Sequence, residues 1–110
     1  MGKPSTRETQ DGTLTLRASE EDSRCVLALS GELDMSNAPL FASELERLEA
    51  AGAPLELDLS KLEFIDSTGI AILVGAYQRL GERLVLVRSE SQGVRRVFSL
   101  TGLDQQLRFR

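Results

Sequence analysis

Apolar and polar residues follow two different periods along the chain, which together predict strands with intervening helices. Apolar residues at every second position predict strands over residues 13–18 and 53–62. Residues 24–31 follow a charged turn, so we expect them to pair antiparallel with residues 13–18. Residues 83–87 predict a further strand, and residues 106–110 predict a short last one.

Apolar residues three and four positions apart predict three helices. The first lies within residues 35–52, where Ser36 or Asn37 could serve as the N-cap. The second covers about residues 67–80 and the third about residues 91–100. From the second strand onward, strands and helices alternate, which indicates right-handed crossovers between parallel strands.

The pattern therefore predicts an α/β fold, with a mixed sheet of about four to five strands. In residues 55–60, leucines alternate with polar residues, so we expect the helices to lie mainly on one face of the sheet. Residues 13–110 form one domain in this interpretation. Residues 1–12 are polar and show no period, and we expect them to form a flexible N-terminal tail.

Three strand-to-helix turns should share one edge of the predicted sheet, because each helix begins beyond the C-terminal end of the preceding parallel strand. The turns are GELDMSN at residues 31–37, EFIDSTG at 63–69 and RSESQG at 88–93. Open α/β sheets place their sites at such an edge. The residues expected to be neighbours there are Asp34, Ser36, Ser67 and Thr68.

Composition excludes several classes of partner and location. The net charge of −4, with 13 scattered Lys and Arg residues, argues against nucleic-acid binding. No apolar run reaches the length of about 18 residues typical of a membrane helix, and no signal segment opens the chain. Cys25 is the only cysteine, so we expect no internal disulfide and a buried thiol. These features predict a cytoplasmic protein without a membrane partner.

The absence of histidine excludes the usual zinc sites and the Ser-His nucleophile pairs. Only Lys3 and Lys61 could replace histidine as a base for Ser67. The chain also lacks a GxxxxGK loop for nucleotide phosphates. We therefore expect no metal, no cofactor and no enzymatic activity.

The run Asp66-Ser67-Thr68-Gly69 has two interpretations. It could cap the following helix, since a polar side chain at that position contributes about 1 kcal/mol and glycine permits a tight turn. It could also carry a phosphate on Ser67, because a helix N-terminus stabilises an anion. A phosphoryl group would add about −1.5 to −2 charges beside Asp34 and Asp66 and weaken the binding of a partner.

Three blocks of sequence carry a family resemblance. They are LSGELDMSNAPLF, LELDLSKLEFIDSTGIAILVGAYQRL and GVRRVFSLTGLDQQL. In this order and spacing they resemble the bacterial anti-sigma factor antagonists, which are single STAS domains. The resemblance runs from about Thr13 to the C-terminus and implies a STAS-like sheet.

The resemblance implies a partner-switching regulator. Members of the family bind an anti-sigma factor, which then releases a sigma factor. The anti-sigma factor is also a serine kinase that supplies the ATP and phosphorylates the antagonist; a serine phosphatase reverses this. The acceptor maps onto Ser67, with Thr68 as runner-up. The implied partner-binding residues are Glu32, Asp34, Ser36, Asp66, Ser67, Thr68 and Gly69.

In this interpretation the free protein should be a monomer or a weak dimer. An alternative function keeps the STAS fold but omits the switch. The domain would then be a scaffold or accessory subunit, as in stressosomes or phospholipid-transport complexes, and the two hydroxyls would only cap a helix.

Overall fold

A computed structural model describes residues 6–110 of the chain. Its strands are β1 Thr6–Asp11, β2 Leu14–Glu21, β3 Arg24–Leu33, β4 Leu55–Ile65 and β5 Leu84–Val87. Its helices are α1 Ala38–Ala50, α2 Ser67–Leu80, α3 Gln92–Leu100 and α4 Leu103–Gln106, with a 3-10 turn η1 at Gly81–Arg83. The predicted second helix therefore has the bounds that the sequence pattern indicated.

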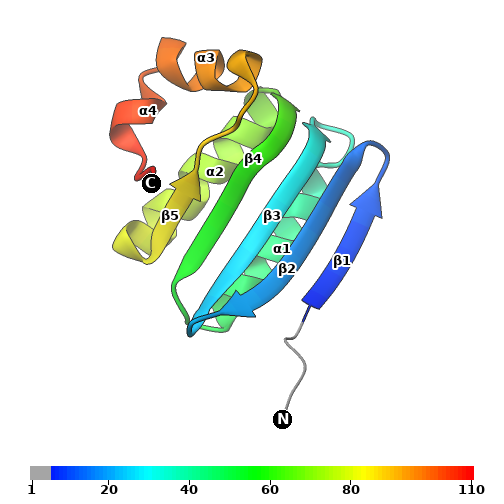
Figure 1. Ribbon diagram of the computed structural model, residues 1–110, viewed down its shortest axis with the longest axis vertical. Coiled ribbons are helices and arrows are strands. Elements are labelled where there is room, and N and C mark those ends of the chain that lie inside the picture. The colour runs from blue at the N-terminus through cyan, green and yellow to red at the C-terminus, as the bar shows by residue number, and fades with distance from the viewer. Residues whose placement is uncertain (1–5) are drawn as a thin grey trace.

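The five strands form one mixed sheet in the order β1-β2-β3-β4-β5. The pairs β1–β2 and β2–β3 are antiparallel, and β3–β4 and β4–β5 are parallel. Figure 1 shows α1 and α2 together behind the sheet, with α3 and α4 beyond its β5 side. This arrangement confirms the predicted α/β class with its main helices on one face.

The core lies between the sheet and the helices α1 and α2. Alternate residues of the strands point into it, including Leu27 and Leu57, and they meet Phe41 of α1 and Leu73 of α2, all fully buried. Cys25 is also buried and free, as predicted. Arg79 at the end of α2 donates two hydrogen bonds, of 2.9 and 2.8 Å, to the Glu49 carboxylate of α1. The two helices are thus joined outside the core as well.

The prediction of a flexible tail is wrong for residues 6–11, which form β1. This strand pairs with β2 along its whole length, from Thr6↔Ser19 to Asp11↔Leu14. Five of its six side chains are exposed, so the strand has no apolar period that the sequence could reveal. Backbone hydrogen bonds hold it instead, together with an ion pair of 3.2 Å from Arg7 Nε to the buried Glu44. The expectation for residues 1–5 lies outside the described residues.

The predicted last strand at residues 106–110 is also largely wrong. The chain forms α4 over Leu103–Gln106 and then makes a single parallel bridge between Phe109 and Leu86. The Leu86 N–H donates to the carbonyl of Arg108 at 2.8 Å, and its carbonyl accepts from Arg110 at 2.8 Å. The segment therefore lies along β5 but is too short to extend the sheet.

Glu56 departs from the simple alternation of β4. The pattern places it on the polar face, yet it is only 5% exposed. Its Oε1 atom lies 2.8 Å from Arg110 Nη1 and 3.5 Å from Arg24 Nη2. Burial of this carboxylate depends on both guanidinium groups, since an unpaired buried charge is strongly unfavourable.

Candidate functional site

Asp66 caps α2 and leaves the two neighbouring hydroxyls unused. Its Oδ1 atom accepts a hydrogen bond of 3.1 Å from the Gly69 N–H. Ser67 is the first residue of α2 and is exposed, while Thr68 is half-buried. Within residues 6–110, neither hydroxyl has a hydrogen-bond partner. Of the three candidate caps in this run, the carboxylate of Asp66 takes the role.

The turn between β3 and α1 is built from side-chain hydrogen bonds. The Ser36 hydroxyl donates to Asp34 Oδ1 at 2.6 Å, and the Ser36 N–H donates to the same atom at 3.0 Å. Asn37 is buried; its Oδ1 accepts from the Asp34 N–H at 3.0 Å, and its Nδ2 donates to the Glu32 carbonyl at 2.9 Å. Asn37 thus occupies the N-cap position, but neither predicted side chain caps the amides of α1.

A hydrogen bond joins the two turns. The Met35 N–H donates to Asp66 Oδ2 at 3.0 Å, and the Asp66 N–H donates to the Leu33 carbonyl at 3.1 Å. Asp66 therefore binds both loops at once, one with each carboxylate oxygen. The prediction that these turns are neighbours is confirmed by these contacts.

The third predicted turn meets β4 further back along the strand. Because β5 has only four residues, the connection to α3 runs beside β4, as Figure 1 shows. The Ser89 hydroxyl donates to the Leu62 carbonyl at 2.7 Å, and the Glu90 N–H donates to the Ser60 carbonyl at 3.1 Å. These contacts place the turn against β4 before its end, whereas the other two turns meet at Asp66.

Gly69, expected among the partner-binding residues, is buried beneath the turn. A Cβ atom at this position would lie 2.8 Å from Leu33 Cγ and 2.9 Å from Ile65 Cγ1. The glycine therefore allows α2 to begin directly against the ends of β3 and β4. The structure thus gives Gly69 a packing role; its part in partner binding stays a prediction.

Two large exposed apolar side chains that the sequence interpretation missed belong to the same two segments, 31–37 and 63–69. Met35 is 73% exposed and Phe64 is 48% exposed. Phe64 pairs with Glu32 across the ends of β4 and β3. The sequence alone does not distinguish them from core residues. We define the Ser67 edge as Glu32, Asp34, Met35, Ser36, Phe64, Asp66, Ser67 and Thr68.

The Ser67 edge is acidic. The segments 31–37 and 63–69 contain four carboxylate residues and no lysine or arginine. The hydroxyl of Ser36 donates to Asp34 and lowers the pKa of that carboxyl below its ordinary value. Asp34 is therefore ionised at neutral pH. The edge thus combines two exposed apolar side chains with several carboxylates.

Residues 6–110 contain no cluster of metal-ligating side chains. Among the helices of that part of the chain, none has both the length and the apolar character required to cross a membrane.

Replacing Asp66 with alanine should lower the free energy of unfolding by about 1–2 kcal/mol, because α2 loses its cap and the Met35 N–H loses its acceptor. Urea denaturation followed by circular dichroism would measure the change. Asp11→Ala in the exposed strand β1 is a control that removes the same charge. Equal stability of the two variants would contradict the role of Asp66.

Comparisons of sequence and structure identify known proteins that this chain resembles. Residues 16–109 match the family described as "Mlab, STAS domain". The anti-sigma-B factor antagonist of Bacillus subtilis is 31% identical over 77 residues, covering 68% of this chain and 71% of that protein. The protein of the same name from Listeria monocytogenes is 36% identical over 80 residues, covering 69% of each chain.

Solved structures agree with the sequence comparisons. A crystal structure of an anti-sigma factor antagonist from Mycobacterium paratuberculosis superposes with a TM-score of 0.80 at 33% identity. The match covers 87% of this chain and 84% of that one. The structure of unphosphorylated SpoIIAA, another anti-sigma factor antagonist, has a TM-score of 0.66 at 20% identity and supports the fold alone. It covers 86% of this chain and 87% of SpoIIAA.

Proposed function

The chain belongs to the STAS domain family, in the group of bacterial anti-sigma factor antagonists, and on this premise we propose how its Ser67 edge works. The edge binds an anti-sigma factor, which then releases a sigma factor. The anti-sigma factor is a serine kinase that binds ATP itself; it phosphorylates Ser67 and so ends the interaction. A serine phosphatase restores binding. The protein acts in the cytoplasm as a binding partner without catalytic activity.

The availability of the Ser67 hydroxyl is the observation that carries this proposal. Asp66 already caps α2, so the Ser67 hydroxyl is not required as a cap. Ser67 remains exposed at the first position of the helix. The free N–H groups of that turn favour a negative group by about 0.3–1 kcal/mol. The fold would therefore tolerate a phosphate there. Thr68 is the second candidate, but its side chain is half-buried.

Neither alternative function accounts for this geometry as well. In a non-switching scaffold the two hydroxyls would serve only as caps, yet Asp66 performs that role. An enzyme with Ser67 as nucleophile would need Lys61 as its base. The Lys61 ammonium instead lies 3.7 Å from the Glu90 carboxylate, and both side chains are exposed.

Phosphosite mapping is the direct test. The protein would be incubated with Mg-ATP and each candidate anti-sigma kinase from the source genome, and its intact mass and modified residue determined. We expect the addition of one phosphoryl group at Ser67, lost in Ser67→Ala and retained in Ser43→Ala, an exposed serine of α1. Formation of a stable complex with a kinase but without phosphate transfer would reject the switch and favour the scaffold function.

Replacing Met35 with alanine should weaken binding of the anti-sigma factor by about tenfold, since a buried apolar contact at an interface centre contributes about 1–2 kcal/mol. Isothermal titration calorimetry would measure the affinity. Leu100→Ala is the matched control, because Leu100 is 77% exposed but lies at the end of α3. An equal loss in both variants would contradict docking at the Ser67 edge.

A further inference from the structure

A cleft separate from the Ser67 edge lies among the β5–α3 turn, α3, α4 and the C-terminal segment. Its volume is about 390 Å³, within the range of roughly 300–1,000 Å³ typical of ligand pockets. Its lining includes Arg88, Arg95, Phe98, Ser99, Asp104 and Phe109. No residue of the Ser67 edge takes part in it.

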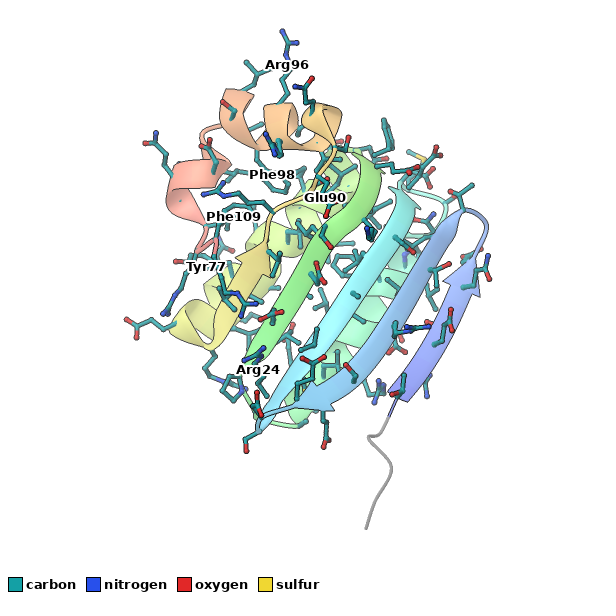
Figure 2. The ribbon with its side chains drawn as sticks, in the orientation of Figure 1. Arg24, Tyr77, Glu90, Arg96, Phe98 and Phe109 are labelled. Atoms are coloured by element: carbon teal, nitrogen blue, oxygen red, sulfur yellow. The ribbon has the colours of Figure 1, made fainter. Side chains whose placement is uncertain are left out.

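Two aromatic rings and one guanidinium form an ordered wall of the cleft. Phe98 and Phe109 meet edge to face, with 5.4 Å between ring centroids and an interplanar angle of 74°. The Arg88 guanidinium carbon lies 4.7 Å from the centroid of the Phe109 ring. Stacking on the ring restricts the guanidinium while its N–H donors stay free for an anion. Figure 2 shows the two rings on the side of the sheet beyond β5.

Arg88 and Arg95 differ from most arginines of the described residues 6–110 in donating to no carboxylate and no backbone carbonyl. Six arginines form ion pairs with carboxylates, and two more donate to backbone carbonyls. Within residues 6–110, Arg88, Arg95 and Arg96 have neither kind of contact. Arg96 points into solvent in Figure 2, whereas the other two line the same cleft.

The surrounding charge favours an anion. Residues 88–110 contain five arginines against two carboxylate residues, a formal charge of +3 in a chain of net charge −4. The preceding residues 1–87 therefore carry −7. Asp104 is the carboxylate residue in the cleft lining, and it forms no ion pair within 4.0 Å with Arg88 or Arg95. Its negative charge disfavours a dianion such as phosphate more than a single carboxylate.

We propose that this cleft binds a carboxylate attached to an apolar, planar group. Arg88 and Arg95 bind the carboxylate, and the apolar group packs against Phe109, whose ring rests on the buried Phe98. Arg88 is the specificity residue, since its stacked guanidinium can present two parallel N–H donors to the two carboxylate oxygens. Such a carboxylate can come from a free aromatic acid or from an acidic side chain beside an aromatic residue of a protein.

Titration of the ¹⁵N-labelled full chain with phenylacetate, followed by NMR, tests the proposal. We expect saturable shifts of the amides of residues 88–109, with at least about tenfold weaker binding of the neutral analogue phenylacetamide. Arg95→Gln and Arg88→Lys should each weaken phenylacetate binding at least about fivefold. The matched control Arg96→Gln, one position along α3, should bind like the unmodified protein. The spectra themselves report whether each variant is folded.

Three results would overturn the proposal. The first is a set of shifts that does not saturate by about 20 mM phenylacetate, since the affinity would then be too weak for a specific site. The others are equal binding of phenylacetamide and phenylacetate, and equal losses of affinity in Arg95→Gln and Arg96→Gln. The source of the carboxylate is distinguished by the dipeptide acetyl-Phe-Glu-amide. Tighter binding of the dipeptide than of phenylacetate identifies a protein segment as the ligand, and weaker binding identifies a free small acid.

Discussion

Replacing Gly31 with alanine is expected to lower the free energy of unfolding by at least about 3 kcal/mol. Gly31 lies in β3 with φ of +95°, a conformation that costs a residue with a Cβ atom about 1–3 kcal/mol. The added Cβ would also overlap the Thr13 carbonyl oxygen and lie 2.9 Å from the Thr13 carbonyl carbon. Because these are backbone atoms, relief requires the start of β2 to move.

A control at Gly52 separates the two contributions. Gly52 also has a positive φ, of +81°, but a Cβ there would meet no atom within 4 Å. Gly52→Ala should therefore cost only about 1–2 kcal/mol. Thermal unfolding by circular dichroism should show a melting temperature at least about 10 °C lower for Gly31→Ala than for the unmodified protein. Equal losses in the two variants would show that conformational strain, and not the clash, is responsible.

Gly31 also connects the fold to the site. The register between β3 and β4 shifts between Ala28 and Ser30, and again between Gly31 and Glu32. After these shifts Leu33 pairs with Ile65, and both side chains point into the core beneath α2. Displacement of β3 at this point would move the turn whose Met35 N–H binds Asp66. We therefore expect Gly31→Ala to disturb the Ser67 edge as well as the fold.

The main elements of the fold were predictable because their apolar periods are strong. The helix over residues 67–80 begins within a polar run and contains the buried residues Leu73, Ala76 and Leu80 at helical spacing. The leucines of β4 instead recur at every second position, so the sheet and its covered face could be inferred from the pattern. The neighbouring turns followed from the geometry of parallel crossovers.

Features that depend on tertiary contacts did not follow from periodicity. β1 is stabilised by backbone pairing at the sheet edge and has no apolar face. Glu56 is buried because Arg24 and Arg110, distant in sequence, converge on it. Met35 and Phe64 are large apolar residues of the kind found in protein cores, and only the structure shows them to be exposed. The exposed apolar part of the Ser67 edge could therefore not be inferred from the sequence.

Ser67→Asp should weaken binding of the anti-sigma factor at least about tenfold without lowering the stability of the fold. An acidic group of the partner about 5 Å from the added charge would cost on the order of 3 kcal/mol at an effective dielectric constant of about 20. The fold is protected because a carboxylate at the first position of α2 is favourable to the helix. Phosphorylation adds more charge, so its effect on affinity should be larger still.

Two control variants separate charge from size and from position. Ser67→Asn introduces a side chain of the same shape as aspartate without its charge. This variant should bind the anti-sigma factor with an affinity within about threefold of the unmodified protein, since surface substitutions usually change the free energy by less than about 0.5 kcal/mol. Ser43→Asp places the same charge on the exposed surface of α1 and should leave affinity unchanged. Titration calorimetry at two salt concentrations would measure all three variants, and the loss in Ser67→Asp should shrink as salt screens the repulsion. Equal weakening by Ser67→Asn and Ser67→Asp would contradict an electrostatic switch, because the bulk of the side chain would then be sufficient to disrupt the interface.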